Sequence, residues 1–451
     1  MRVGLFSSHW VLLFPLLLLP PLAPALAATP ATAATEPAWP QWRGPARDGW
    51  ATAVPAGKAP VSLPKDPRLL WKVKAGPGLA SPVVAGGKVF LFDGSEGKET
   101  VRALDAISAR ELWRAAVDEN FHDEQGPDGP RCTPLVDGDV VFVQSSRGEL
   151  QCRAVADGAL RWRANFRTEF GSALLGEDSV IPGAAEHGYT ASPLVAGSQL
   201  IACPGGTNGA GIVSFDLRTG RLLWKSQSDL ASYAAPIRAT VAGREQIVCF
   251  TVEGVLGLDA AEGRLLWRVP LKTSYGRNVT TPVVIEDWVI VGSYQAGLVG
   301  IQVSAPGPDG AGGWQAVRRW TNKAAAMNFS SPVTAGRRLF GLGPARNFLC
   351  LDPATGKVMW SKEGFWHGSA DGAYGAFIVL DADRFLLWTD AGEAILIAVD
   401  GAGCRELGRA QLAGKNWCSP AWVDGRIYVR DGMSTSGHWS AFELAPPIAA
   451  P

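Results

Sequence analysis

Polar and aromatic residues precede a repeated Ser/Thr-Pro element along this 451-residue chain, and their types suit ligand binding. Two arginines with several amides can hold an anionic or hydroxyl-rich ligand through charged and bidentate hydrogen bonds. The same residue types also suit loops in contact with water, and the sequence leaves that alternative open. The residues are Arg131, His187, Tyr189, Tyr233, Arg277, Asn278, Asn328, Asp371, Asn416 and Trp417.

Other residues that could do chemistry lack suitable neighbours. His122, Asp123 and Glu124 resemble a metal cluster, but three consecutive residues cannot all face one ion, which favours a solvated loop. His367 follows Trp366 and could stack on a ligand, although packing within a Gly-rich loop is the simpler interpretation. No nucleophile elbow, zinc-protease motif, P-loop or dinucleotide fingerprint occurs, so the sequence predicts no catalytic residue.

Two repeated elements must position these residues. In the first, Ser or Thr and then Pro lead into a β-rich run. The second consists of Asp, three residues, Gly, three residues and Trp, as in Asp216, Gly220 and Trp224. The Asp starts a turn and the Gly supplies a positive φ, so each repeat predicts about four short antiparallel strands. Copies of the first element, some degenerate, begin at Ser81, Thr133, Ser192, Ala235, Thr281, Ser331, Phe377 and Ser419.

The spacing of the repeats predicts an all-β, eight-bladed β-propeller. Successive copies lie 42 to 59 residues apart, and a four-stranded blade takes about 40 to 50 residues. Seven blades are the alternative if the degenerate repeat at Phe377 does not form a full sheet. The run around Trp71 resembles an outer strand, whereas the last repeat has none after Phe442. We therefore predict that the strand around Trp71 completes the last blade.

The hairpins with Leu or Phe before Asp216, Asp259 and Asp352 resemble the PQQ-like β-propeller repeat family across residues 67–445. That family includes quinoprotein alcohol dehydrogenases and the propeller subunit of the outer-membrane protein assembly machinery. For the dehydrogenases, the resemblance implies PQQ in a central funnel, with calcium held by Glu and Asn. The chain has no adjacent Cys pair and no haem motif, so we expect no cofactor. The opening resembles a secreted bacterial branch of the family through Trp39, Pro40, Gln41, Trp42, Arg43, Gly44 and Pro45.

The N-terminal sequence predicts export. Arg2, an apolar run over residues 10–19 and the small-residue end at Ala25 and Ala27 indicate a signal peptide over residues 1–27. We expect a flexible leader and N-terminal arm over residues 28–66, the propeller over 67–445 and a tail over 446–451. The mature chain should be periplasmic or secreted and soluble, without a transmembrane segment. Seven widely spaced Cys predict neither a disulfide framework nor a zinc site.

Composition narrows the function without specifying it. Lys and Arg number 42 against 42 Asp and Glu, which argues against nucleic acid as a partner. We predict a non-catalytic binding or scaffold protein with envelope protein partners and room for a small-molecule ligand in the central channel. The alternative is a PQQ- and calcium-dependent alcohol or sugar dehydrogenase that uses Arg277, Asn278, Asn328 and Asp371. A third, minor option is sugar binding by stacking on Tyr233 and Trp417.

Overall fold

The computed structural model describes residues 1, 4, 37–51, 54, 59–173, 184–293, 296–307, 312–366, 374–433 and 437–445. The chain divides into two compact units, Met1–Thr35 and Glu36–Pro451. Nearly all of the predicted signal peptide lies outside the described residues, as do His367, Asp371 and the tail over 446–451. The described strands and helices all belong to the second unit.

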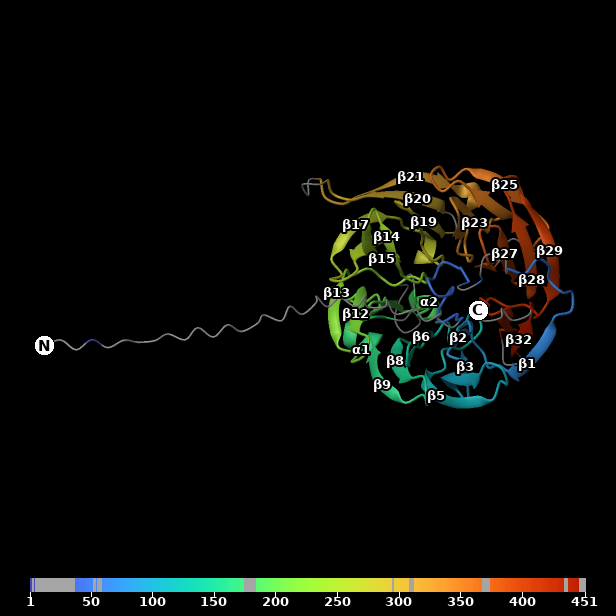
Figure 1. Cartoon of the computed structure of the whole chain (residues 1–451), viewed down its shortest axis with the longest axis horizontal. Coiled ribbons are helices and arrows are strands. Elements are labelled where there is room, and N and C mark those ends of the chain that lie inside the picture. The colour runs from blue at the N-terminus through green and yellow to red at the C-terminus, as the bar shows by residue number, and fades with distance from the viewer. Residues whose placement is uncertain are drawn as a thin grey trace. The chain divides into compact units, whose positions relative to one another are not determined.

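The described residues form eight four-stranded antiparallel sheets arranged as blades around one axis (Figure 1). The predicted eight-bladed β-propeller is therefore confirmed. The degenerate repeat at Phe377 also forms a complete blade, because Phe377 pairs with Leu387 in a regular ladder. Short helices lie between some of the strands: α1 (Phe166–Phe170), α2 (Ala184–His187), η1 (Ser274–Gly276) and η2 (Lys323–Ala325).

The blades are numbered 1 to 8 in chain order. The strands of each blade are named in order from the innermost strand, beside the axis, to the outermost strand, at the rim. Blades 1 to 4 comprise β2 (Val83–Ala85), β3 (Lys88–Ser95), β4 (Lys98–Asp105) and β5 (Glu111–Glu119); β6 (Leu135–Asp137), β7 (Val140–Gln144), β8 (Glu149–Ala154) and β9 (Leu160–Asn165); β10 (Leu194–Ala196), β11 (Gln199–Ala202), β12 (Ile212–Asp216) and β13 (Leu222–Ser226); β14 (Ile237–Val241), β15 (Arg244–Phe250), β16 (Gly254–Asp259) and β17 (Leu265–Pro270).

Blades 5 to 8 repeat this order, except that the outer strand of blade 8 comes from the start of the propeller. They comprise β18 (Val283–Ile285), β19 (Trp288–Ser293), β20 (Gly297–Ser304) and β21 (Gln315–Asn322); β22 (Val333–Ala335), β23 (Arg338–Leu342), β24 (Phe348–Leu351) and β25 (Val358–Lys362); β26 (Gly375–Val379), β27 (Arg384–Thr389), β28 (Glu393–Val399) and β29 (Cys404–Gln411); β30 (Ala421–Val423), β31 (Arg426–Asp431), β32 (His438–Glu443) and β1 (Arg68–Lys74).

The ring closes as the sequence predicts. Strand β1 pairs antiparallel with β32, so that Trp71 lies opposite Ala441 and Val73 opposite Trp439. The indole of Trp71 then donates a hydrogen bond of 3.0 Å to the carbonyl oxygen of Ala106 in blade 1. The first and last strands of the propeller thus share one sheet, which removes the open edge that blade 8 would otherwise present.

The Asp, Gly and Trp positions of the repeat join neighbouring blades. In blade 3, Trp224 donates from Nε1 to the carbonyl oxygen of Ala261 in the next blade, at 3.1 Å. Its ring covers Gly263, where an added Cβ would lie only 2.4 Å from the indole. Trp113, Trp162 and Trp320 repeat this contact with the corresponding glycines. The repeat therefore needs a Gly both for its positive φ and for space under the neighbouring blade's Trp.

The Ser/Thr-Pro elements form a second set of contacts between blades, close to the axis. The amide of Ser81 donates to the hydroxyl of Thr133 at 3.2 Å, and the amide of Thr133 donates to the hydroxyl of Ser192 at 3.1 Å. The amide of Ser419 in blade 8 donates to Ser81 at 3.0 Å and so continues the series across the closure. These hydroxyls explain the preference for Ser and Thr in the repeat.

Replacing Gly263 tests the contact between Trp and the hairpin. Gly263→Ala should lower the free energy of unfolding by about 3 kcal/mol, because the new Cβ clashes with Trp224 and the backbone has φ +69°. Gly243→Ala is the control, since Gly243 has φ +79° and open space around the added Cβ. It should cost only about 1 kcal/mol. If urea unfolding shows that both variants lose the same free energy of unfolding, the clash with Trp224 is not the cause.

Candidate functional site

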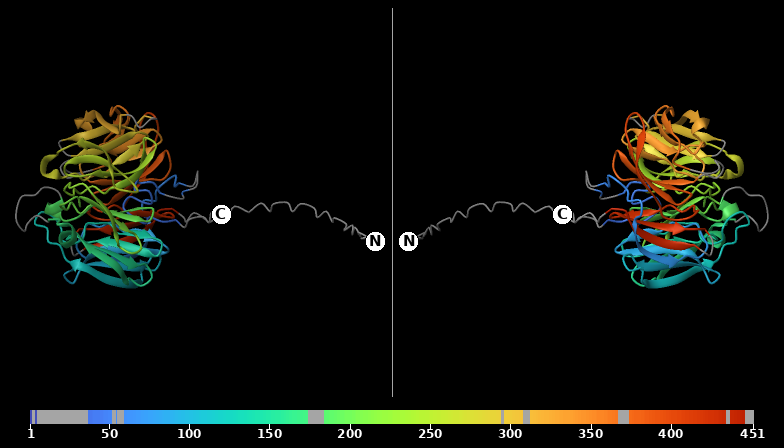
Figure 2. Two further views of the ribbon diagram at one scale, coloured as in Figure 1. Left: turned by 90° about the vertical axis from the view of Figure 1, so that its left-hand side faces the viewer. Right: turned by 90° about the vertical axis from the view of Figure 1, so that its right-hand side faces the viewer.

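An N-terminal segment crosses the propeller axis and hydrogen-bonds to the inner part of the blades. We call residues 37–51 the axial segment. Trp39 and Val84 in β2 exchange two backbone hydrogen bonds of 2.8 and 2.9 Å, and the amide of Val136 in β6 donates to Pro40 at 2.8 Å. At its other end, the amide of Ala51 donates to Val379 in β26 at 2.9 Å. Figure 2 shows blue N-terminal residues at one face of the propeller.

Side chains of the axial segment reach blades 5 and 6 between these points. Trp42 donates from Nε1 to the hydroxyl of Thr281 beside blade 5, at 2.9 Å. Arg43 donates to the carbonyl oxygen of Pro332 beside blade 6, at 2.5 Å. Trp50 donates to the carbonyl oxygen of Thr334 in β22 of the same blade, at 2.8 Å.

Arg47 is the most buried cation of the axial segment and binds two blades at once. Its Nη1 donates to the carbonyl oxygens of Ser192 and Pro236, both at 3.0 Å, and Nη2 donates to that of Pro193. Burial lowers the pKa of Arg47 to about 9, which leaves the group protonated at neutral pH. Arg43 and Arg47 both have left-handed backbone, with φ of 60° and 61°. This conformation is costly for residues other than Gly and persists where surrounding contacts impose it.

Replacing Arg47 tests whether the axial segment stabilises the ring. Arg47→Met should lower the free energy of unfolding by about 3–5 kcal/mol, because buried carbonyl oxygens of two blades lose their donor. Arg68→Met is the control, since the Arg68 side chain is 67% exposed and pairs with Glu443 at the rim. The control should change stability by less than about 1 kcal/mol. A loss below about 1 kcal/mol for Arg47→Met in urea unfolding would contradict the role.

A cavity of about 500 Å³ lies on the axis beside Trp42. Buried hydroxyl groups of the Ser/Thr-Pro elements line its deep end, whereas Gln125, Gly126 and Lys415 are exposed to solvent. Its volume falls in the range of about 300–1,000 Å³ typical of ligand sites. The lining includes Trp42, Asp123, Gln125, Arg131, Thr133, His187, Ser192, Tyr233, Arg277, Thr281, Phe329, Ser331, Tyr374, Lys415, Trp417 and Met433.

One wall of the cavity carries a buried charge cluster around Asp123. Arg131 donates to Oδ2 of Asp123 at 2.5 Å, and Nδ1 of His187 lies 2.9 Å from the same oxygen. Burial alone would raise the pKa of Asp123, but bonds to His187 and the Gln125 amide, with the charge of Arg131, outweigh burial and lower it. Burial lowers the pKa of Arg131. The cluster thus holds an ionised carboxylate inside the protein.

A second ion pair lies beside the first and is more accessible. Arg277 donates from Nε to Glu186 in α2 at 3.0 Å, and Gln125 donates to the same carboxylate at 3.0 Å. The bond to Glu186 raises the pKa of Arg277, and the bond from Arg277 lowers the pKa of Glu186. The Arg277 guanidinium also lies 5.2 Å from the ring centre of Tyr275.

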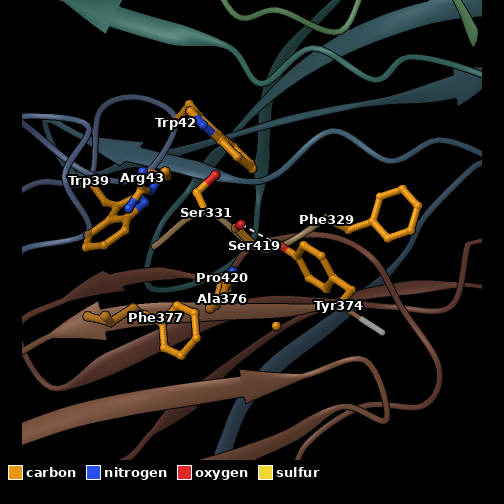
Figure 3. A pocket seen from close by; sticks show the side chains of 12 residues that line it. Trp39, Trp42, Arg43, Phe329, Ser331, Tyr374, Ala376, Phe377, Ser419 and Pro420 are labelled. Atoms are coloured by element: carbon orange, nitrogen blue, oxygen red, sulfur yellow. Dashed lines mark hydrogen bonds between the residues drawn. The ribbon is translucent and has the colours of Figure 1, made fainter. Parts of the chain in front are cut away.

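Aromatic side chains form the opposite wall. The rings of Phe329 and Trp417 lie 4.8 Å apart, and those of Tyr374 and Trp417 lie 6.5 Å apart in a stacked arrangement. The hydroxyls of Tyr374 and Ser419 are 2.6 Å apart, which positions the tyrosine ring. Figure 3 shows a small neighbouring pocket in which Phe329 and Tyr374 lie on one side of Ser419, with Trp39 and Arg43 on the other.

The structure brings some of the nominated residues together and separates others. Arg131, His187, Tyr233, Arg277 and Trp417 all line the cavity. Sequence reasoning missed Trp42, Phe329, Tyr374 and Lys415, which line it as well. Trp42 stood out only as part of an opening motif, and no spacing rule linked it to a blade.

The remaining nominated residues that the structure describes do not line the cavity. Asn278 is buried, where it donates to the carbonyl of Thr251 at 2.8 Å and accepts from Thr273 at 2.7 Å. Asn416 is also buried and accepts from the indole of Trp388 at 2.9 Å. Asn328 is half-buried outside the lining, and Asp371 lies outside the described residues. Tyr189 packs edge-on against Phe166.

The interpretation of residues 122–124 as a solvated loop is wrong for Asp123. His122 and Glu124 are exposed, but Asp123 is only 6% exposed and binds Arg131 and His187. Successive side chains of this turn point in opposite directions. Three consecutive polar residues in the sequence could not reveal that.

Comparison with known proteins identifies the family. A family model described as outer membrane protein assembly factor BamB matches residues 97–362, more than half of the chain. The chain belongs to this family. BamB of Yersinia pestis is 26% identical over 258 residues, which cover 49% of this chain and 60% of the relative. The chain therefore spans less than two thirds of that relative's length.

Two further BamB proteins extend the comparison. BamB of Bordetella pertussis is 23% identical over 375 residues, covering 81% of this chain and 74% of the relative. The crystal structure of BamB from Moraxella catarrhalis has a TM-score of 0.53 and 14% identity, with 85% of this chain and 99% of that chain covered. At this identity, the structural likeness shows the fold alone.

The described residues near the axis of this BamB-family propeller do not fit the calcium site of the predicted alternative. Calcium prefers several convergent carboxylate and amide oxygens. The amide oxygens of Asn278 and Asn416 already accept hydrogen bonds away from the cavity, and the carboxylates of Asp123 and Glu186 are paired with Arg131 and Arg277. Among the described residues, no three acidic, His or Cys side chains converge as metal ligands.

Asp123 gives this BamB-family propeller a specific pH dependence. Because its pKa is lowered in the folded state, ionised Asp123 stabilises the fold above the unfolded value of about 3.9. That contribution is lost as the pH falls through the lower folded pKa. Asp123→Asn should therefore cost about 2–4 kcal/mol at about pH 7, because Arg131 stays buried without its counter-ion, and progressively less below about pH 4.

Urea unfolding of both proteins between about pH 7 and about pH 3 measures this difference. The control is Asp66→Asn, since Asp66 is exposed, and it should follow the wild-type stability within about 0.5 kcal/mol. A penalty for Asp123→Asn that stays constant with pH would show that the carboxylate charge is not the cause.

Proposed function

We propose that this protein is an exported, non-catalytic propeller that binds protein partners in the cell envelope. The observation that carries the proposal is the match of a BamB family description to residues 97–362, which span strands of blades 1 to 6. The named function of the relatives is outer membrane protein assembly. A closed ring with short inner strands and many surface loops is a rigid base on which partners can dock.

The contacts of the charged groups support a binding role over catalysis. The buried carboxylate of Asp123 accepts from Arg131 and lies against His187, and Glu186 accepts from Arg277. A general base is effective when its pKa lies near the working pH, whereas these carboxylates have lowered values. None of the helices in the described part of the chain has the length and apolar character that a membrane crossing requires.

Affinity capture from envelope extracts tests the proposal. The full chain, tagged at its C-terminus, should retain outer-membrane assembly proteins in a fixed stoichiometry that survives moderate salt. The matched control is the same tagged chain after heat denaturation, which reports capture that does not need the folded ring. Capture of no envelope protein above the background of an unrelated periplasmic protein would overturn the scaffold role.

The dehydrogenase alternative has its own test. Purified protein incubated with PQQ and calcium should retain no PQQ absorbance after gel filtration, and it should not reduce an electron-accepting dye in the presence of alcohols or sugars. Retained PQQ together with dye reduction would establish a quinoprotein and refute a purely non-catalytic role.

A further inference from the structure

We propose that the axial cavity binds a small organic monoanion, a carboxylate attached to an aromatic ring system. The inference rests on the cavity itself and is independent of the scaffold role, because its test needs no envelope partner. Three features carry it: a closed deep end, an aromatic wall and one cation in excess near the opening.

The axial segment closes the deep end of the cavity. Trp42 is held there by Thr281, and the segment continues through Arg47 to the carbonyl groups beside blades 3 and 4. The exposed lining residues are instead Gln125, Gly126 and Lys415. A ligand therefore enters past Lys415 and meets Trp42 at the far end.

The aromatic wall beside the deep end is suited to a ring, and each hydroxyl oxygen of the deep end already has one bond to the protein. The hydroxyl oxygens there accept hydrogen bonds from the protein: Thr133 from Ser81, Ser192 from Thr133, and Ser331 from the amide of Thr281 at 2.9 Å. The wall beside them consists of Phe329, Tyr374 and Trp417. The rings of Phe329 and Tyr374 lie 4.8 and 6.5 Å from that of Trp417, and aromatic faces accept another ring by offset or edge-on packing.

The charges favour one negative charge on the ligand. Among the described residues that line the cavity or pair with its lining, Arg131, Arg277 and Lys415 contribute three cations, whereas Asp123 and Glu186 contribute two anions, so one positive charge is in excess. Lys415 is exposed and has no acidic partner among the described residues, and Nε of Arg131 is buried there without an acceptor. A carboxylate near Lys415 balances the excess, whereas a ligand with three carboxylates would exceed it.

Titration calorimetry with 2-naphthoate and its neutral isostere 2-naphthamide tests the assignment. The carboxylate should bind with 1:1 stoichiometry and at least about tenfold more tightly than the amide, because only the carboxylate balances the excess charge. Equal binding of the two probes, or no saturable binding of the carboxylate, would overturn the proposal. So would a methyl glucoside that binds more tightly than either.

Variants locate the binding. Lys415→Glu should weaken 2-naphthoate by at least about tenfold while leaving 2-naphthamide within about twofold, a split that misfolding cannot produce. Trp417→Leu should weaken both probes by about tenfold. The controls are Lys225→Glu on the outer strand β13 and Trp314→Leu beside β21, both outside the cavity lining, and neither should change binding. Unchanged affinity in both cavity variants would refute the site.

Discussion

The hydrogen bonds from Arg47 to blades 3 and 4 are the constraint on which the rest of the axis depends. A guanidinium is planar and carries five donors, so one side chain can satisfy carbonyl groups from two blades at once. Those carbonyls face the axis, where no further strand can pair with them. Without a donor, they would need water in the channel, and the deep end of the cavity would be open.

Two kinds of contact between blades make that axis rigid. At the rim, the indole of one blade covers the Gly of the next blade's hairpin, as Trp224 covers Gly263. Near the axis, Ser and Thr hydroxyls accept from the neighbouring blade's amides, as Thr133 accepts from Ser81. Both kinds of contact continue across the closure, because Trp71 of blade 8 donates to Ala106 of blade 1 and the amide of Ser419 donates to the hydroxyl of Ser81. The cavity walls therefore come from blades whose relative positions are fixed at two radii.

Repetition explains how much of this could be predicted from the sequence. Each blade carries its own hairpin signal, so eight blades and the closing strand around Trp71 follow from local spacing. Position before the Ser/Thr-Pro element also indicated Arg131, Tyr233, Arg277 and Trp417 as residues near the axis. Sequence position does not determine the direction in which each side chain points. Asn278 and Asn416 point into the blades instead.

The axial segment was beyond prediction for a different physical reason. It has no periodic pattern, and its partners lie far away in the sequence, as Trp42 and Thr281 are separated by 239 residues. The sequence around Arg43 and Arg47 does not show that these side chains are buried, because their carbonyl partners come from distant blades. Likewise, the burial of Asp123 depends on Arg131 and His187, which only the closed ring brings together.

Hydrogen–deuterium exchange of the full chain tests most directly whether residues 37–51 seal the axis. The amides of Trp39 and Ala51, which donate to Val84 and Val379, should exchange as slowly as those of the inner strands. Exchange of the whole segment within seconds at neutral pH, while the inner strands stay protected, would contradict a sealed axis and the closed-ended cavity built on it.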